Sequence, residues 1–226
     1  MHRFPSQILK STQLSPDVKL LRFSVPTDFS FIPGQFASLI IPTGEKPVRK
    51  PYSIACMPNA EYVEFCVKKL GSGSTLLHEL PNGSEIEITG PYGRFTVQHP
   101  ENPMVFVATG TGVSPFRAMI PSLLMTGYTS PVHLIFGCRS ETGILFKDEF
   151  EQLAKKYPHF THSVVVSRPS SDYGGVHGRV EVLLEKLQDF NADFYICGLN
   201  EMIVSVRTFL EKKGVPKGRM FTERYD

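Results

Sequence analysis

The first part of the chain consists of short apolar runs separated by turn signals, a pattern typical of β-structure. Glu85-Ile86-Glu87-Ile88 alternates cleanly between two faces, and prolines and glycines punctuate the runs around it. In this part, which ends near Val97, only Ser74 to Leu80 suggests a helix. Several short strands with one helix predict a small antiparallel barrel. The expected strands cover residues 18–25, 36–41, 62–67 and 85–88.

The second part of the chain has a different pattern, in which apolar strands alternate with helices. A buried-type strand at 105–108 is followed by a glycine turn, and apolar residues then recur at helical spacing from Phe116 to Leu124. Pro121 should kink this helix. Such alternation predicts a doubly wound parallel sheet. The other expected strands cover 132–136, 164–166 and 194–197, and the other helices lie near 150–157, 179–188 and 201–212.

The segment between the two parts is polar and has no periodicity. Gln98 to Pro103 carries two prolines, Pro100 and Pro103, and it is the best candidate for a domain boundary. We therefore expect one domain at residues 1–98 and a second at residues 103–226.

Composition excludes several classes of protein. The net charge of +2 argues against a dedicated nucleic-acid binder, and no stretch approaches the ~20 apolar residues that span a bilayer. The first residues lack a secretion signal, so we expect a cytoplasmic protein with reduced cysteines. The four cysteines are far apart and the seven histidines are scattered, so we expect no metal site. The cysteines are Cys56, Cys66, Cys138 and Cys197.

The glycine turn Gly110-Thr111-Gly112 follows a strand and precedes a helix whose first turn suits Pro115. Its glycines let the backbone approach a ligand closely, and the free N–H groups of the helix start favour a phosphate. A plain turn that needs positive φ is the alternative interpretation. Pro115 occupies the last glycine position of the usual G-x-G-x-x-G fingerprint, which disfavours an ordinary dehydrogenase.

Five motifs in a fixed order resemble those of the ferredoxin–NADP reductase superfamily, which includes flavin reductases and reductase components of oxygenases. The similarity covers nearly the whole chain. It implies a Greek-key barrel that binds flavin and an α/β domain that binds NADPH or NADH. The implied activity is that of an FAD-dependent NAD(P)H oxidoreductase. The motifs are Lys50 to Ser53, Gly71 to Ser74, Gly90 to Phe95, Gly110 to Pro115 and Cys197 to Met202.

On the flavin side, the resemblance implies that Tyr52 packs on the isoalloxazine and that Ser53 lies near its N5 atom. Lys50 replaces the arginine of the family motif, so either its ammonium or the neighbouring Arg49 would hold the flavin phosphate. The alternative interpretations are a solvated surface lysine for Lys50 and ordinary strand positions, with the tyrosine half-buried, for Tyr52 and Ser53. For the motif that begins at Gly71, the alternative is a plain Gly/Ser turn. The glycine motif would offer backbone N–H and hydroxyl donors to a pyrophosphate, which favours FAD over FMN. The remaining expected flavin residues are Pro51, Cys66, Val67, Lys68, Gly71, Gly73, Ser74 and Thr75.

On the nicotinamide side, the resemblance implies that Cys197 lines the ring pocket as a shaping residue and not as a nucleophile. Glu223 and Tyr225 would reach the flavin, with Tyr225 as an aromatic cover, although a frayed tail is nearly as good an interpretation. With Ser53 and Cys197 they form the expected catalytic set. Arg139 and Arg168 could bind a 2′-phosphate, which slightly favours NADPH, unless they form surface salt bridges. The other expected nucleotide residues are Thr109, Gly110, Thr111, Gly112, Val113, Pro115, Gly198 and Met202.

The electron acceptor is expected to be separate: ferredoxin, flavodoxin, an oxygenase component or free flavin. We expect a monomer. Two alternatives are a non-catalytic electron-transfer or regulatory subunit and a nucleotide-binding module without flavin. A basic rim could dock an acidic carrier, although a solvated charged face explains it equally well. Its residues are Lys46, Arg49, Lys50, Lys68 and Lys69.

Overall fold

The computed structural model describes residues 2–44, 46–59 and 61–225. Its internal contacts divide the chain into two compact units. The first unit contains the residues up to Val97 together with Ser114–Ser122, and the second contains Gln98–Val113 and the residues from Leu123 onward. A short helical segment from the second half of the sequence therefore belongs to the first unit, which the expected domain limits of 1–98 and 103–226 did not anticipate.

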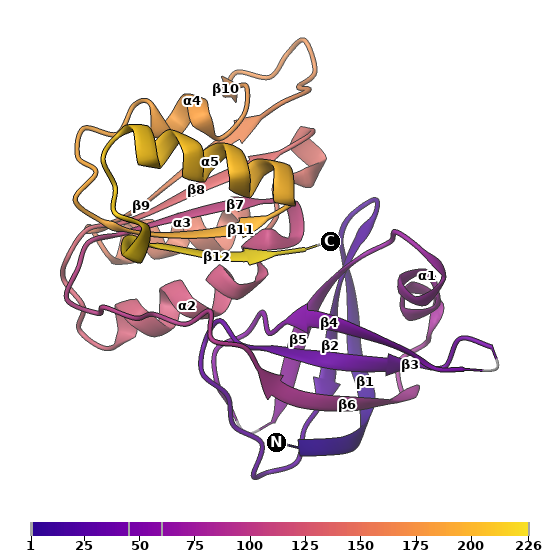
Figure 1. Ribbon diagram of the computed structural model, residues 1–226. Helices are drawn as coiled ribbons and strands as arrows, with labels where there is room; N and C mark the ends of the chain where they lie inside the picture. Colours follow the sequence, from indigo (N-terminus) through magenta and orange to yellow (C-terminus); the bar gives the residue numbers. More distant parts are fainter. Residues whose placement is uncertain (1, 45, 60, 226) are drawn as a thin grey trace. The chain divides into compact units, whose positions relative to one another are not determined.

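The first unit contains a curled sheet of six strands, all paired antiparallel, in the order β4-β3-β6-β1-β2-β5 (Figure 1). Its two edge strands meet at a bridge between Ile54 and Phe65, which gives the sheet its barrel-like closure. The expectation of an antiparallel barrel is confirmed. The elements are β1 (His2–Ser15), β2 (Val18–Ser24), β3 (Phe36–Ile41), β4 (Val48–Ser53), β5 (Tyr62–Lys68), α1 (Ser72–Glu79) and β6 (Glu85–Tyr92).

Alternating side chains fill the barrel. Along β1, Phe4, Ser6 and Ile8 are buried while the residues between them are exposed. The Ser6 hydroxyl donates to the carbonyl of Ser24 (2.6 Å), which satisfies a polar group inside the strand pair. Aromatic rings such as Phe23 and Phe65 complete the core.

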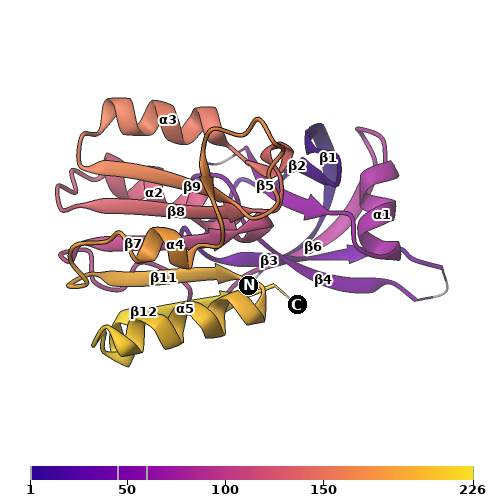
Figure 2. The ribbon, with the colours of Figure 1, turned by 90° about the horizontal axis from the view of Figure 1, so that it is seen from above.

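The second unit contains six strands, all paired parallel, in the order β10-β9-β8-β7-β11-β12. Figure 2 shows this order from β9 to β12, and β10 is labelled in Figure 1. The predicted parallel sheet is confirmed. The strands are β7 (Met104–Thr109), β8 (Val132–Cys138), β9 (Phe160–Val166), β10 (Val176–His177), β11 (Asp193–Gly198) and β12 (Met220–Arg224). The α-helices are α3 (Lys147–Lys156), α4 (Glu181–Leu184) and α5 (Asn200–Lys212), while most of α2 (Ser114–Met125) belongs to the first unit. Three 3₁₀ segments are η1 (Gly110–Val113), η2 (Glu141–Gly143) and η3 (Lys217–Arg219).

The strand order places a topological switch in the middle of the parallel sheet. The chain starts at β7, moves outward through β8 and β9 to β10 at the edge, and then returns to β11 on the other side of β7. Ligands of such sheets bind outside the carboxyl ends of the strands at this point. The fold therefore directs attention to the residues that follow β7 and β11.

One predicted helix is much shorter than expected, because the helix near 179–188 is α-helical only over Glu181–Leu184. The helix predicted from Phe116 to Leu124 is present as α2, and it includes Pro121, which cannot donate a hydrogen bond to the preceding turn. No helix in the described part of the chain is long and apolar enough to cross a membrane.

Asp193, at the start of β11, ties the predicted boundary segment to the second unit. Its carboxylate is completely buried. It accepts hydrogen bonds from His99 Nδ1 (2.7 Å), Asn102 Nδ2 (3.2 Å) and Arg219 Nε (2.9 Å). The Tyr195 hydroxyl also accepts the backbone N–H of Gln98 (2.9 Å). The segment expected to mark the domain boundary thus begins the second unit and is hydrogen-bonded within it.

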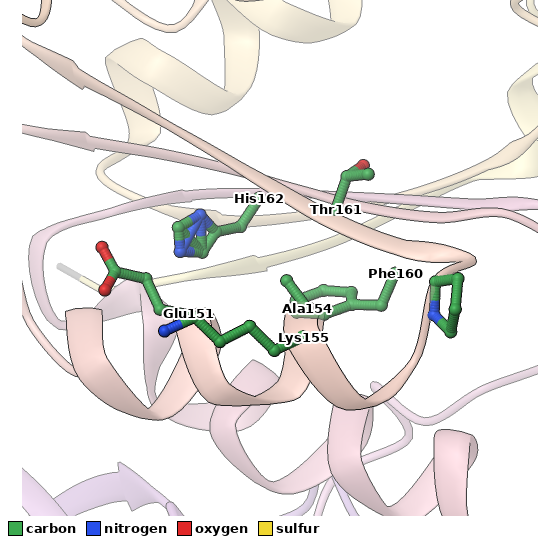
Figure 3. Close-up of a pocket in the computed structure, with 7 residues that line it drawn as sticks. Glu151, Ala154, Lys155, Phe160, Thr161 and His162 are labelled. Carbon is green, nitrogen blue, oxygen red and sulfur yellow. The ribbon is translucent and has the colours of Figure 1, made fainter.

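An open groove of about 450 Å³ lies between α3 and β9 (Figure 3). Glu151, Ala154 and Lys155 line it from the helix, and Phe160, Thr161 and His162 line it from the strand. Burial lowers the pKa of His162, an effect that the Glu151 carboxylate opposes. Its Nε2 atom is buried and has no hydrogen-bond partner among the described residues.

We expect the second unit to lose stability on acidification because of His133 and His162. Burial lowers the pKa of both imidazoles below the ordinary value of 6.5. Below pH 6.5 the two histidines become protonated in the unfolded chain while they are still neutral in the folded chain. The free energy of unfolding therefore has its full value above pH 6.5 and decreases as the pH falls towards the folded pKa values. Urea unfolding between pH 7.5 and 5 should show this slope, and His133→Gln/His162→Gln should flatten it. A flattening of the same size in the exposed control His177→Gln would contradict the assignment.

Candidate functional site

The predicted flavin residues of the first unit lie on three elements that contact one another. Strand β4 carries Arg49 to Ser53, β5 carries Cys66 to Lys68, and Gly71 caps the start of α1. Helix α1 contacts β5 and β3, and β4 contacts β5. Residues separated by up to 26 positions are therefore brought to one region of the barrel.

Strand β4 presents side chains of graded exposure. Ser53 is buried, Tyr52 is half-buried beside the Phe65 ring (6.4 Å between centroids), and Lys50 and Pro51 are exposed. Burial raises the pKa of Tyr52 to about 12, so its phenol stays neutral and can donate a hydrogen bond. The Arg49 guanidinium lies 5.1 Å from the centroid of the Tyr92 ring. In the described part of the chain Lys50 has no ion pair, so its ammonium is available to a phosphate.

The cations of the predicted basic rim are not equally available. Lys68 pairs with Asp17 (3.3 Å) and Lys69 lies 4.0 Å from Glu79. Among the described residues, Lys46, Arg49 and Lys50 form no ion pair with a carboxylate. The rim therefore carries less net positive charge than the sequence alone indicates.

Helix α1 is anchored to the barrel at its far end. His78 is buried, and its Nε2 atom donates to the carbonyl of Val67 on β5 (2.7 Å). The His78 carbonyl accepts from Lys19 Nζ (2.6 Å). His78 is one of the scattered histidines, and the structure shows that it is packed inside the first unit.

The start of α1 has the features of a phosphate cradle. The Ser74 hydroxyl accepts the N–H groups of Leu70 (2.9 Å) and Gly71 (3.0 Å) and donates to the Gly71 carbonyl (3.0 Å). This hydroxyl is thus committed to shaping the loop. Helix geometry leaves the first-turn N–H groups without intrahelical acceptors. A Cβ added to Gly71 would meet nothing within 4 Å, so a pyrophosphate could approach this backbone closely.

In the second unit, the glycine turn packs directly against the end of β11. Gly110 has φ of +56° and open space where a Cβ would lie. A Cβ on Gly112 would lie only 2.2 Å from the carbonyl oxygen of Cys197. The turn thus needs glycine at both positions for different reasons, left-handed backbone at the first and close approach at the second. Thr111 and Val113 complete η1, and Pro115 lies in the first turn of α2.

Thr109, Gly198 and Met202 meet at the topological switch. Gly198 has φ of +159°, and a Cβ there would lie 2.4 Å from Thr109 Oγ1 and 2.6 Å from Met202 Cε. Thr109 Oγ1 is buried without a hydrogen-bond partner among the described residues. An unsatisfied hydroxyl at a switch point fits a site whose polar partner is a bound nucleotide.

Cys197 is completely buried and faces Glu223 across the β11–β12 pair. Burial and the Glu223 carboxylate raise the pKa of the Cys197 thiol well above its ordinary value. A neutral thiol is a poor nucleophile, which agrees with the expected shaping role.

Residues 220–225 are folded and not frayed. Residues 220–224 form β12, and the Tyr225 N–H donates to the carbonyl of Gly198 (3.0 Å). The tail alternative is therefore wrong. The structure places the expected catalytic residues Cys197, Glu223 and Tyr225 on adjoining strand ends.

Arg139 and Arg168 follow β8 and β9 and lie side by side, with the Arg168 N–H donating to the Arg139 carbonyl (2.8 Å). Both are exposed, and in the residues that the structure describes neither forms an ion pair. The nearby Glu141 carboxylate instead accepts the Ser170 N–H (2.8 Å) and hydroxyl (2.6 Å). Among the described residues the surface salt bridges considered as an alternative are therefore absent, and both guanidiniums are available to an anion there.

Sequence reasoning missed one buried ionic cluster in the first unit. Glu64 on β5 pairs with Arg22 (2.8 Å) and with Arg117 of α2 (2.6 Å). A signal was present, because Glu64 interrupts an apolar strand and Arg117 interrupts an apolar helix. Charges in such positions are rarely buried without a partner.

Comparison with known proteins assigns the two halves to described families. Residues 5–97 match the oxidoreductase FAD-binding domain and residues 106–208 match the oxidoreductase NAD-binding domain. A relative, ferredoxin–NADP reductase B of Sorangium cellulosum, is 33% identical over 99% of this chain and 98% of its own length. The electron transfer component of toluate 1,2-dioxygenase from Pseudomonas putida is 29% identical, and the chain spans only 59% of it.

Solved structures share the fold over nearly the entire chain. A cytochrome P450 reductase from Amycolatopsis superposes with a TM-score of 0.90 at 21% identity, covering 99% of this chain and 69% of that one. A ferredoxin–NADP⁺ reductase from Neisseria gonorrhoeae, solved with FAD and NADP, gives 0.86 at 21% identity and 98% coverage of both chains.

Proposed function

Because the chain belongs to the ferredoxin–NADP reductase-like flavoproteins, we propose that it carries electrons from NADPH to a separate ferredoxin-type protein. The broader activity is that of an FAD-dependent NAD(P)H oxidoreductase with a separate acceptor. The observation that supports the proposal most is the packing of Gly112 against Cys197 at the switch of the parallel sheet. This contact holds the glycine turn at the carboxyl ends of β7 and β11, where a parallel sheet of this kind binds its nucleotide.

The residues of the first unit fit FAD. First-turn N–H groups of α1 and the ammonium of Lys50 would hold its pyrophosphate, and Tyr52 and Ser53 would contact its ring. When bound, FAD supplies a ring that accepts a hydride from NAD(P)H and releases the electrons to an acceptor. Hydride transfer needs no acid–base pair from the protein.

The residues of the second unit fit the coenzyme. The Gly110 turn would contact the pyrophosphate of the coenzyme, and the hydroxyl of Thr109, which lacks a partner among the described residues, would donate a hydrogen bond to the coenzyme. Cys197, with its neutral thiol, would limit the space for the nicotinamide without reacting with it. Glu223 on β12 and Tyr225 just after it would line the same pocket.

Anaerobic stopped-flow reduction of the FAD-loaded protein tests the function. We expect NADPH to bleach the flavin absorbance faster than NADH, and the reduced protein to reoxidise on addition of ferredoxin. Reoxidation by flavodoxin, an oxygenase component or free flavin alone would replace the proposed acceptor. If neither coenzyme bleaches the bound flavin, the function itself is wrong.

The coenzyme preference is proposed to depend on Arg139 and Arg168. A charge-assisted hydrogen bond contributes about 1.5–3 kcal/mol, so Arg139→Gln/Arg168→Gln should raise KM for NADPH by at least about tenfold. KM for NADH should stay within about twofold, since NADH lacks the 2′-phosphate. Steady-state kinetics with both coenzymes measure this, with Arg207→Gln on α5 as a control. Equal losses with NADH and NADPH would contradict a 2′-phosphate site.

A further inference from the structure

The seam of the barrel, defined here as the contact between the end of β4 and β5, is reinforced by a side chain from α2. Its backbone bonds include the Ile54–Phe65 bridge and the Ala55 N–H that donates to the Glu64 carbonyl (2.8 Å). Arg117 Nη1 donates to the Ala55 carbonyl on one side (2.7 Å) and to Glu64 Oε2 on the other (2.6 Å). One guanidinium nitrogen thus crosslinks the two edges of the sheet.

The seam lies next to the expected flavin residues. Ala55 is two positions after Ser53, and Glu64 is two positions before Cys66. A shift of Ala55 away from Glu64 would therefore move Ser53 relative to β5. Binding sites are sensitive to such displacements, because contacts that orient a reacting ring depend on fractions of an ångström.

Glu64 gives the crosslink a fixed anchor. Its side chain is only 5% exposed, and Arg22 of the neighbouring strand donates to its other oxygen, Oε1, from Nε (2.9 Å) and Nη2 (2.8 Å). The two guanidiniums together hold both of its oxygens. Arg117 therefore contacts a carboxylate that cannot rotate freely.

We propose that Arg117 is a positioning residue for the flavin site, which it organises by fixing the end of β4 against β5. The proposal rests on the proposed function, since it assumes that FAD binds along β4 and β5. Arg22 provides a natural comparison. It contacts the same carboxylate, but it lies within the β2–β5 ladder, which is already paired from Val18 to Ser24. Loss of Arg22 removes one positive partner of the Glu64 carboxylate but leaves the contact between Ala55 and Glu64 intact.

The test compares Arg117→Met, Arg117→Lys and Arg22→Met. We expect Arg117→Met to raise the Kd for FAD by about tenfold or more and Arg22→Met by less than about threefold. At saturating FAD, Arg117→Met should also change the visible circular dichroism of the flavin and its midpoint potential. Arg117→Lys should restore part of both, because an ammonium can donate to two acceptors. The thermal stability of the flavin-free proteins shows how much of each change is structural.

The outcomes separate this inference from the proposed function. Equal Kd values and equal flavin spectra for Arg117→Met and Arg22→Met would show that the cluster only stabilises the fold, which overturns the inference. A wild-type protein that binds no FAD would overturn the proposed function instead. If Arg117→Met does not fold, the comparison of Arg117→Lys with Arg22→Lys decides the question by the same measurements.

Discussion

Replacement of Gly112 by alanine is expected to slow reduction by NAD(P)H about 10²-fold while FAD remains bound. The new Cβ would lie 2.2 Å from the Cys197 carbonyl oxygen, 2.7 Å from its carbon and 3.1 Å from Gly198 Cα. All three are backbone atoms, so no side chain can rotate away and the turn must separate from β11. A displacement of about 1 Å in a binding site can reduce the rate about 10²-fold.

The Gly112→Ala effect is measured as kcat/KM in stopped-flow reduction, with the FAD content determined in the same sample. Gly218→Ala is a suitable control, because a Cβ there would meet nothing within 4 Å. It should retain wild-type kinetics. If Gly112→Ala keeps kcat/KM within about threefold of the wild type, the turn does not bind the coenzyme as proposed.

The largest loss of stability is expected for Asp193→Ala. The carboxylate is fully buried and holds His99, Asn102 and Arg219, so its removal leaves the Arg219 guanidinium, 23% exposed, without its counter-charge. Removal of one partner from a buried ion pair costs about 3–5 kcal/mol, and the partial exposure of Arg219 places the expected loss near about 3 kcal/mol. Urea unfolding of the second unit measures it.

Two further variants test the Asp193 interpretation. Asp193→Asn should lose nearly as much stability, because its amide N–H groups would face donors on at least one side. Asp172→Ala removes an exposed carboxylate and should change the free energy of unfolding by less than about 0.5 kcal/mol. A loss below about 1 kcal/mol for Asp193→Ala would mean that water replaces the carboxylate without penalty.

The parts of the fold that could be predicted from the sequence have a local cause. The run at 105–108 and the glycines after it reveal a buried strand and a turn, because both depend on neighbouring residues. Strand β4 escaped notice because Arg49, Lys50 and Pro51 are all exposed at an edge of the sheet, so the strand shows no alternation of apolar and polar positions. Strand β1 was missed because one of its inward positions is Ser6, whose partner Ser24 is 18 residues away.

In the candidate site, too, the sequence predicts the residues of local motifs but not the contacts between distant residues. The motifs located Thr109, Gly112, Cys197 and Gly198, and the structure brings these four residues together. The sequence could not reveal that the Ser74 hydroxyl is used within its own loop, since this depends on loop geometry. The contact between Glu64 and Arg117 spans 53 positions, and no periodic pattern reports a pair at that separation.

The membership of Ser114–Ser122 in the first unit has a consequence for exchange of domains between relatives. Phe116 of this segment lies 5.9 Å from the Phe95 ring, between centroids, and Arg117 contacts Glu64. A chimera joined at the boundary segment would take α2 from one parent and the barrel from another. Its barrel would then lack the native partners of Phe95 and Glu64. Recombination that also transfers residues 114–122 should give active hybrids more often than a single crossover.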